Sequence, residues 1–334
     1  MSLPRAVLKR LIAYPLLVAA AIGLFWVVSI RMPGEDNAGP LPPLSPTEDT
    51  TRALLMRHVV TLVDSLGPRW AAGTGLEGAA QYIEARFSDH GYEVASQRYV
   101  ADQREVRNIE VTVRGREWPD SIIVIGAHYD AVDGTPGADD NASGTAALLE
   151  LARRLAGSTP RRSVRFVAFT LEEPPHFWAE SMGSLVYARA ARARGDAIIA
   201  MLSLESLGYF SDSAGSQRYP PVLGWFYPKV GDFVAVVGNV QSRALVHDVV
   251  GHLRTQSAVR TVGTATLNAF PGVGWSDHWS FWQVGYPAVM LSGTATFRNP
   301  HYHERSDTPE KLDYVRLAHV VTGLERTVRH LADR

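Results

Sequence analysis

Side chains able to bind metal ions follow apolar runs at four places in this 334-residue chain. They stand in the motifs His128-Tyr129-Asp130, Asp139-Asp140-Asn141, Glu172-Glu173 and His301-Tyr302-His303. The first three motifs lie close together in the sequence and the fourth lies far downstream, so one fold must bring them together. Imidazole and carboxylate ligands without a thiolate suit zinc, with cobalt or manganese as substitutes. We therefore expect a hydrolase site that holds two Zn²⁺ ions.

The runs that precede these motifs predict an α/β protein. Four of them are apolar enough to be strands buried on both faces of a sheet: 121–127, 163–170, 197–204 and 287–291. Helical patterns alternate with them at 142–156, 184–194, 277–284 and 314–331. Two more amphipathic runs predict an antiparallel edge at 93–100 and 108–114. We expect one three-layer α/β/α sandwich with a mixed, mostly parallel central sheet.

The sheet predicts where the metal-binding groups meet, because ligands of open α/β sheets bind outside the carboxyl ends of the strands. His128, Glu173 and His303 each follow a different predicted strand, and Glu205 follows the run 197–204 as a fifth ligand. Asp139 joins them from the loop that leads into the helix at 142. It is the natural carboxylate to bridge the two metals. His128 and Glu205 then complete one metal site, and Glu173 and His303 complete the other.

The motifs occur in the order seen in the M28 family of zinc aminopeptidases and carboxypeptidases, which the chain resembles over residues 50–331. Further matching stretches are Leu66-Gly67-Pro68-Arg69, Ser276-Asp277-His278-Trp279-Ser280 and Ser306-Asp307-Thr308-Pro309. The resemblance implies an exopeptidase that hydrolyses peptide bonds near a chain terminus through a metal-bridging hydroxide. It implies five metal ligands: His128, Asp139 as the bridge, Glu173, Glu205 and His303.

The resemblance also implies roles around the ligands. Glu172 acts as the general base, Asp130 supports His128, and a strained or cis peptide joins Asp139 to Asp140. Chemical reasoning gives the paired glutamates the same roles, since one carboxylate can bind metal while its neighbour takes a proton from the attacking water. The best-known aminopeptidases of the family carry Asp at the position of Glu205, and this difference leaves the preferred substrate terminus open.

Two histidines have competing interpretations. His301 is the alternative ligand to His303, which the resemblance favours. His278 either begins a helix after Asp277 or donates a hydrogen bond to the oxyanion opposite the metals, as a third catalytic residue beside Glu172 and Asp130. The segment 174–178 replaces a short glycine-rich turn with Pro and aromatic residues, and we expect it to form a wall of the substrate pocket.

Other functions are compatible with the same fold. A glutaminyl-cyclase-like acyltransferase uses one zinc, whereas the aspartate pair and the full set of five ligands favour two metals. A non-catalytic receptor ectodomain is the third possibility, but such relatives commonly lose ligands or the base, and none is missing here. The expected substrate is a peptide or a small amide. A net charge of −1 gives no basic surface for nucleic acid, and the sequence leaves the oligomeric state open.

The N-terminus predicts a single-pass membrane protein. Residues 11–30 carry no charge and are long enough to cross a bilayer, and Arg5, Lys9 and Arg10 precede them. This bias places residues 1–10 in the cytoplasm and the catalytic domain on the periplasmic or extracellular side. The alternative is a cleaved signal peptide, but the stretch is long and lacks a small-residue cleavage site.

A Pro-rich linker is expected at 31–44, before a metallopeptidase domain at 45–334. The motif Ser45-Pro46-Thr47-Glu48 predicts a capping box at the start of this domain. The chain contains no cysteine, so the exported domain must be stabilised by packing and metal rather than by disulfides.

Overall fold

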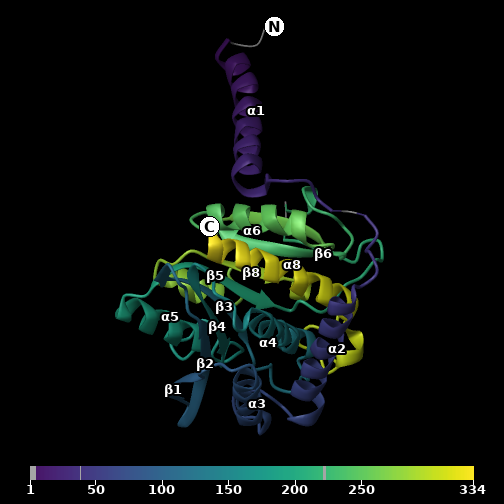
Figure 1. Ribbon diagram of the computed structural model, residues 1–334. Helices are drawn as coiled ribbons and strands as arrows, with labels where there is room; N and C mark the ends of the chain where they lie inside the picture. Colours follow the sequence, from purple (N-terminus) through teal and green to yellow (C-terminus); the bar gives the residue numbers. More distant parts are fainter. Residues whose placement is uncertain (1–4, 38, 221–222) are drawn as a thin grey trace.

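A mixed sheet of eight strands forms the centre of the protein, in a computed structural model that describes residues 5–37, 39–220 and 223–334 (Figure 1). Its order is β1-β2-β4-β3-β5-β8-β6-β7. The strands are β1 (Ala95–Ala101), β2 (Arg104–Val113), β3 (Trp118–His128), β4 (Arg162–Phe169), β5 (Ala197–Glu205), β6 (Phe233–Asn239), β7 (Arg260–Thr266) and β8 (Ala288–Ser292). The four strands β4, β3, β5 and β8 run parallel, and β1 and β2 form the antiparallel edge that the sequence predicts.

Helices cover both faces of this sheet. They are α2 (Pro46–Val60), α3 (Gly75–Asp89), α4 (Gly144–Leu155), α5 (Gly183–Arg194), α6 (Arg243–Gln256), α7 (His278–Gln283) and α8 (Tyr314–Asp333). The helices α2, α3, α4, α6 and α8 share one hydrophobic core, and α5 and α7 share another on the opposite face (Figure 1). The predicted α/β/α sandwich is therefore confirmed, although the unit β6-α6-β7 is an addition that the sequence did not predict.

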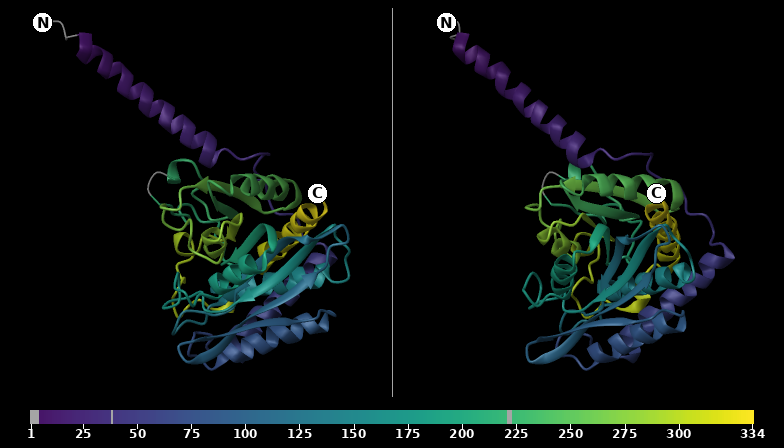
Figure 2. Two further views of the ribbon diagram at one scale, coloured as in Figure 1. Left: turned by 90° about the vertical axis from the view of Figure 1, so that its left-hand side faces the viewer. Right: turned by 60° about the vertical axis from the view of Figure 1, so that its left-hand side comes forward.

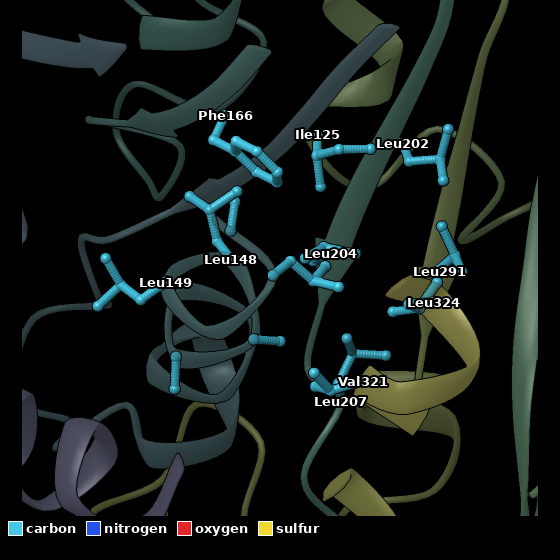
Figure 3. Close-up of a cluster of buried hydrophobic side chains, with 14 of the residues drawn as sticks. Ile125, Leu148, Leu149, Phe166, Leu202, Leu204, Leu207, Leu291, Val321 and Leu324 are labelled. Carbon is cyan, nitrogen blue, oxygen red and sulfur yellow. The ribbon is translucent and has the colours of Figure 1, made fainter. Parts of the chain in front are cut away.

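The larger core holds the strands that end at the functional residues. Ile125 and Leu204 project from β3 and β5 toward Leu148 of α4 and Leu324 of α8, and all four side chains are fully buried (Figure 3). Burying such a side chain stabilises a fold by about 1.5–3 kcal/mol. The strand ends therefore form a rigid platform for the loops that follow them.

The second face is covered differently at the β6–β7 side of the sheet. Here loop residues Tyr219 and Tyr227 pack against Phe233 of β6 and Val262 of β7. The loops leave an apolar cavity of about 100 Å³, well above the roughly 10–15 Å³ that one water molecule needs. We call this space the β6–β7 pocket; Glu205 and Tyr302 are among the residues that line it.

Within the described residues, one helix is long and apolar enough to cross a membrane. It comprises α1 (Arg5–Phe25) and the turn η1 (Trp26–Ile30), and its apolar stretch runs over Ala13–Ile30. The helix projects away from the domain, with its C-terminal end beside β7 (Figures 1 and 2). Residues 1–4 of the predicted cytoplasmic segment lie outside the described residues.

The predicted linker at 31–44 follows the surface of the domain. Arg254 donates hydrogen bonds to the carbonyls of Pro33 and Gly34, and Asp36 forms an ion pair of 2.5 Å with Arg260. The predicted capping box at Ser45 then begins α2. These contacts attach the segment to the same side of the sheet as the end of the apolar helix.

Candidate metal centre

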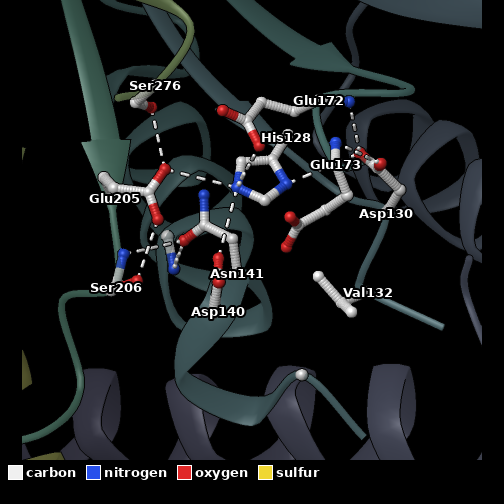
Figure 4. Close-up of polar contacts among 12 residues, drawn as sticks. His128, Asp130, Val132, Asp140, Asn141, Glu172, Glu173, Glu205, Ser206 and Ser276 are labelled. Atoms are coloured by element: carbon white, nitrogen blue, oxygen red, sulfur yellow. Dashed lines mark hydrogen bonds and ion pairs between the residues drawn. The ribbon is translucent and has the colours of Figure 1, made fainter. Parts of the chain in front are cut away.

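Imidazole and carboxylate groups converge at the carboxyl ends of the parallel strands, as the sheet prediction requires (Figure 4). His128 ends β3, and its Nε2 lies 3.2 Å from Glu205 Oε2 at the end of β5 and 3.4 Å from Asp140 Oδ1. On the other side, His303 Nε2 lies 3.1 Å from Asp140 Oδ2 and 3.5 Å from Glu173 Oε2. Asp140 thus presents one carboxylate oxygen to each imidazole.

The aspartate pair differs from the prediction, because Asp139 does not join this cluster. Its Oδ1 accepts hydrogen bonds from the backbone N–H groups of Gly208 and Tyr209, at 2.7 and 3.1 Å. Its Oδ2 accepts a hydrogen bond of 2.9 Å from Asn299. The central position expected for Asp139 is therefore occupied by Asp140, while Asp139 ties together the loops that surround the site.

Neighbouring groups hold the turn that contains Asp140. Asp307 accepts hydrogen bonds from the backbone N–H groups of both Asp139 and Asp140, at 2.9 and 3.2 Å. Asn141 accepts hydrogen bonds from the N–H groups of Gly144 and Ser206. The cis peptide bond of this turn joins Asp140 to Asn141, one residue beyond the expected position.

Asp130 connects the histidine motif to the paired glutamates. Its two carboxylate oxygens accept hydrogen bonds of 3.1 Å from the backbone N–H groups of Glu172 and Glu173. Its Oδ1 also lies 3.5 Å from His128 Nδ1, the ring nitrogen that faces away from the cluster. This arrangement fits a supporting role for Asp130, because its carboxylate faces the imidazole and fixes the turn after β4.

Arg69, which belongs to one of the matching sequence stretches, holds the loop between Tyr129 and Gly137. The buried guanidinium donates to the carbonyls of both residues and to those of Leu62 and Pro136. Burial lowers the pKa of Arg69 to about 10, and the nearby carboxylates partly offset this change. It therefore remains a cation at neutral pH and tethers the loop that begins at the end of β3.

The chemistry of the cluster fits bound metal ions. Both ring nitrogens of His128 and Oε1 of Glu173 are buried without a hydrogen-bond partner in the described part of the chain. Four carboxylates form the cluster: Asp140, Glu172, Glu173 and Glu205. Among the described residues, their ion-pair contacts are with histidines only, and no Lys or Arg takes part. Four buried acids around two imidazoles leave a negative charge that cations must compensate.

The pKa values reflect this concentration of acids. Burial, together with the charge of Asp140, raises the pKa of Glu173 to about 8. The pKa of Asp140 is held below its usual range. Burial alone would raise it, but the hydrogen bonds and charges of the imidazoles of His128 and His303 outweigh that effect. Burial raises the pKa of Glu172 well above its ordinary value, and Glu173 and Glu205 raise it further.

Glu172 is placed differently from its neighbour Glu173. Its Oε2 lies 3.8 Å from His128 Nε2, and its side chain lines an open pocket of about 280 Å³ together with Phe177 and Trp275. We call this space the central pocket. A carboxylate with a raised pKa on the wall of a substrate pocket is suited to proton transfer. Phe177 belongs to the segment 174–178, so the expected aromatic wall is present.

The structure shows which of His301, His303 and His278 lie at the cluster. His303 joins the cluster, whereas His301 hydrogen-bonds Ser306 near the surface. His278 does not reach the cluster, since its Nε2 makes a 2.7 Å hydrogen bond with the carbonyl of Val273 and its ring packs against Trp282. Burial lowers the pKa of His278 to about 4, so it stays neutral in the core behind the pockets. Its expected place beside the oxyanion is therefore not observed.

Tyr302, rather than His278, lines the pockets beside the cluster. Its ring stacks on that of His303 with centroids 3.8 Å apart, and it lines both the central pocket and the β6–β7 pocket. Burial and the carboxylates, Asp140 foremost, raise the pKa of Tyr302 above its usual range, so the phenol keeps its proton. The sequence signal for this residue was its position directly before the ligand candidate His303.

Comparison with known proteins is decisive for the family. The model of peptidase family M28 matches residues 108–328 of the chain. The chain belongs to peptidase family M28. This M28 chain is accordingly a metal-dependent hydrolase, as the resemblance of its motifs implied.

Relatives of this M28 chain include proteins with and without a described activity. An uncharacterized protein of Escherichia coli K12, YfbL, is 38% identical over 280 residues, which make up 81% of this chain and 85% of YfbL. A probable leucine aminopeptidase of Arthroderma otae is 26% identical over 276 residues, or 78% of this chain and 67% of the relative.

Solved structures share the M28 fold at low sequence identity. The aminopeptidase from Aneurinibacillus sp. strain AM-1 superimposes with a TM-score of 0.66 at 18% identity, covering 86% of this chain and 95% of the other. Glutaminyl cyclase of Porphyromonas gingivalis gives a TM-score of 0.61 at 20% identity, covering 85% and 98%.

Proposed function

We propose that this M28 peptidase is a membrane-anchored aminopeptidase that uses two Zn²⁺ ions. One ion is assigned to His128, Asp140 and Glu205, and the other to Asp140, Glu173 and His303. The observation that carries the proposal is the position of Asp140, whose two oxygens lie 3.4 and 3.1 Å from the two imidazoles. A shared carboxylate of this kind suits a pair of metals bound side by side.

The residues around the metals have separate tasks in hydrolysis. Bound zinc supplies a water of lowered pKa and a Lewis acid for the carbonyl oxygen. Glu172 takes a proton from the attacking water and delivers it to the nitrogen of the departing peptide. The protonated phenol of Tyr302 faces the carboxylates and donates a hydrogen bond to the oxyanion that forms on the substrate.

The charges of the site favour a substrate with a free N-terminus. The described residues that line the central pocket include four acids and no Lys or Arg. Bound zinc would balance these carboxylates, but the described lining offers no Lys or Arg to bind the C-terminal carboxylate of a peptide, whereas Glu205 can accept a hydrogen bond from an α-amino group. Glu205 lies between the central pocket and the β6–β7 pocket, where it can hold that amino group.

The β6–β7 pocket supports a preference for an apolar first residue. Its walls include Tyr227, Phe233, Val262 and Met290, and an apolar side chain gains about 25 cal/mol for each Å² removed from water there. The single cation of its described lining, Arg218, is exposed and donates to the carbonyl of Thr296. The name of the Arthroderma otae relative, a probable leucine aminopeptidase, agrees with this preference.

The test compares peptides that differ only at their ends, with the full chain supplied with zinc. We expect cleavage of a peptide with a free N-terminal Leu and an amidated C-terminus, and no cleavage when the N-terminus is acetylated. Metal analysis is expected to give two zinc ions per chain. Cleavage that needs a free C-terminus contradicts the aminopeptidase proposal.

A glutaminyl-cyclase-like acyltransferase is the second candidate, because the fold also resembles the Porphyromonas gingivalis enzyme. One zinc per chain together with cyclisation of N-terminal glutamine identifies that activity. A non-catalytic receptor role predicts neither reaction. The five ligands assigned above, with Asp140 as the shared one, and the base Glu172 support peptidase activity over these two alternatives.

Replacing Asp140 and Asp139 separately tests which of them bridges the metals. Asp140→Asn is expected to lose at least one zinc per chain and to lower kcat/KM by about 10²-fold or more, because a neutral amide is a poor bridging ligand. The matched variant Asp139→Asn is expected to keep its zinc and to unfold at a lower temperature. Loss of zinc from Asp139→Asn with retention in Asp140→Asn contradicts the assignment.

Replacing Tyr302 tests the oxyanion donor. Tyr302→Phe is expected to lower kcat by about 10²–10³-fold, with zinc content unchanged, because one preorganised donor is lost. The control is Tyr314→Phe, since the Tyr314 hydroxyl donates to the carbonyl of Pro309 outside both pockets. Unchanged kcat for Tyr302→Phe excludes this role.

The N-terminal helix is proposed to remain attached and to anchor the domain at 45–334 outside the cytoplasm. Its end is docked on the domain, since Ile30 is buried and Arg243 donates hydrogen bonds to the carbonyls of Val27 and Val28. We expect the mature chain to keep the apolar helix and to sediment with membranes. Protease added to the outside of spheroplasts is expected to digest the domain, and N-terminal sequencing checks for cleavage.

A further inference from the structure

Two loops of the catalytic domain touch the apolar helix inside its membrane-compatible stretch. The ring centroid of Phe25 lies 6.0 Å from the ring centroid of Phe226 and 6.2 Å from that of Phe270. Phe25 precedes the end of the stretch at Ile30 by five residues. At about 1.5 Å per helical residue, the two loops reach roughly 7 Å past that end. We call the loops 223–227 and 267–272 the anchor-side loops.

The contact is fixed by polar bonds as well as by the aromatic rings. Arg243 at the start of α6 donates to the carbonyls of Val27 and Val28, at 3.0 and 2.8 Å. Thr264 of β7 donates to the carbonyl of Ser29 at 3.2 Å. The helix is therefore held to the β6–β7 side of the domain and does not swing freely on a linker. Any membrane around the helix meets the same surface of the domain.

The anchor-side loops present apolar side chains next to the helix. Trp225 is 81% exposed and Leu267 is 61% exposed. Neither loop contains an acidic residue, and Trp26 of the helix, also exposed, lies beside Arg31. Tryptophan and basic residues are typical of the membrane–water interface, where the ring meets the acyl boundary and the cation meets the headgroups.

We propose that the anchor-side loops insert into the bilayer interface beside α1, so that the partner of this surface is the lipid bilayer itself. The inference rests on the membrane anchoring proposed above and adds a second attachment of the domain. It lays the β6–β7 side of the catalytic domain against the membrane. Leu223, Tyr227 and Pro271 of these loops also line the β6–β7 pocket, so one wall of that pocket lies at the lipid surface.

The absence of cysteine from the chain allows a direct test on the full-length protein. Four single-cysteine variants are labelled with the environment-sensitive dye NBD: Leu17→Cys, Trp225→Cys, Leu267→Cys and Val100→Cys. Val100 is the matched control, because it is 71% exposed and lies on β1, far from α1 (Figure 1). The proteins are placed in phosphatidylcholine–phosphatidylglycerol vesicles, with or without lipids that carry a nitroxide on the acyl chain.

Nitroxide lipids are expected to quench NBD at positions 17, 225 and 267 and to leave position 100 unchanged. The emission at 225 and 267 is also expected to shift to the blue when vesicles replace detergent. Quenching at 17 without quenching at 225 and 267 overturns the loop insertion and leaves the anchor intact. No quenching at 17 overturns both. Peptide cleavage by each variant, measured separately, shows that the domain is folded and tests the aminopeptidase activity independently of the membrane.

Discussion

Glu172→Gln is expected to lower kcat by about 10²–10⁴-fold while two zinc ions stay bound, because the amide keeps the shape of the side chain and cannot accept the proton of the attacking water. The acid is buried and carries a raised pKa, and it faces the central pocket 3.8 Å from His128 Nε2. Steady-state kinetics and metal analysis of the same preparation measure the two expectations together.

The neighbouring glutamate provides the matched variant. Glu173→Gln is expected to lose zinc from the site shared with His303, because Glu173 Oε2 lies 3.5 Å from His303 Nε2. The two substitutions are chemically identical and adjacent in the chain, so a difference in metal content separates the base from the ligand. Normal turnover by Glu172→Gln would rule out the proposed proton transfer.

Removing the metals is expected to stop hydrolysis and to destabilise the domain. An ion present at 1,000 times its Kd stabilises a protein by about 4 kcal/mol. Two such ions correspond to a loss on the order of 10 °C in Tm for a domain of this size. Chelation followed by thermal unfolding measures the loss, and added zinc is expected to restore both Tm and activity.

The metal-free protein is expected to be less stable at pH 8 than at pH 5. Burial raises the pKa of Glu173 from 4.5 to about 8 and raises those of Glu172 and Glu205 in the same direction. The folded state then binds more protons than the unfolded state over this range, so stability falls as the pH rises. The raised pKa of His303, about 10, acts with the same sign. A metal-free Tm that is independent of pH would contradict the proposed cluster of buried acids.

The sequence predicted the part of the fold that carries the site, for a physical reason. The carboxyl-terminal halves of β3, β4 and β5 and the whole of β8 are buried on both faces, so they form mostly apolar runs that stand out in the sequence. The strand β7 lies at the edge of the sheet and consists largely of Thr, Gly and Ala. Such composition gives little hydrophobic signal for β7, whereas the apolar run of β6 was present in the sequence and was not recognised.

The sequence could not identify which of two adjacent aspartates turns inward. Asp139 and Asp140 differ by one position, and their orientation depends on Asp307, which lies 168 residues from Asp139 and accepts hydrogen bonds from both N–H groups. Gly137 contributes as well, because its φ of 66° begins the turn. The position of His278 could not be predicted from the sequence either, because it depends on a hydrogen bond with the carbonyl of Val273 that only the folded structure reveals.

The loops that cover the second face of the sheet at β6 and β7 affect how the substrate preference of this enzyme can evolve. The metal-binding groups follow strands that pack against the helices of the larger hydrophobic core. The β6–β7 pocket, in contrast, is covered by loops. Loops accept substitutions and length changes far more readily than a packed core does. With the proposed roles of this pocket and of the metal ligands, new substrate preferences can arise in the segments around Tyr219 and Pro271 without changes to the metal-binding residues, so specificity and catalysis can evolve independently.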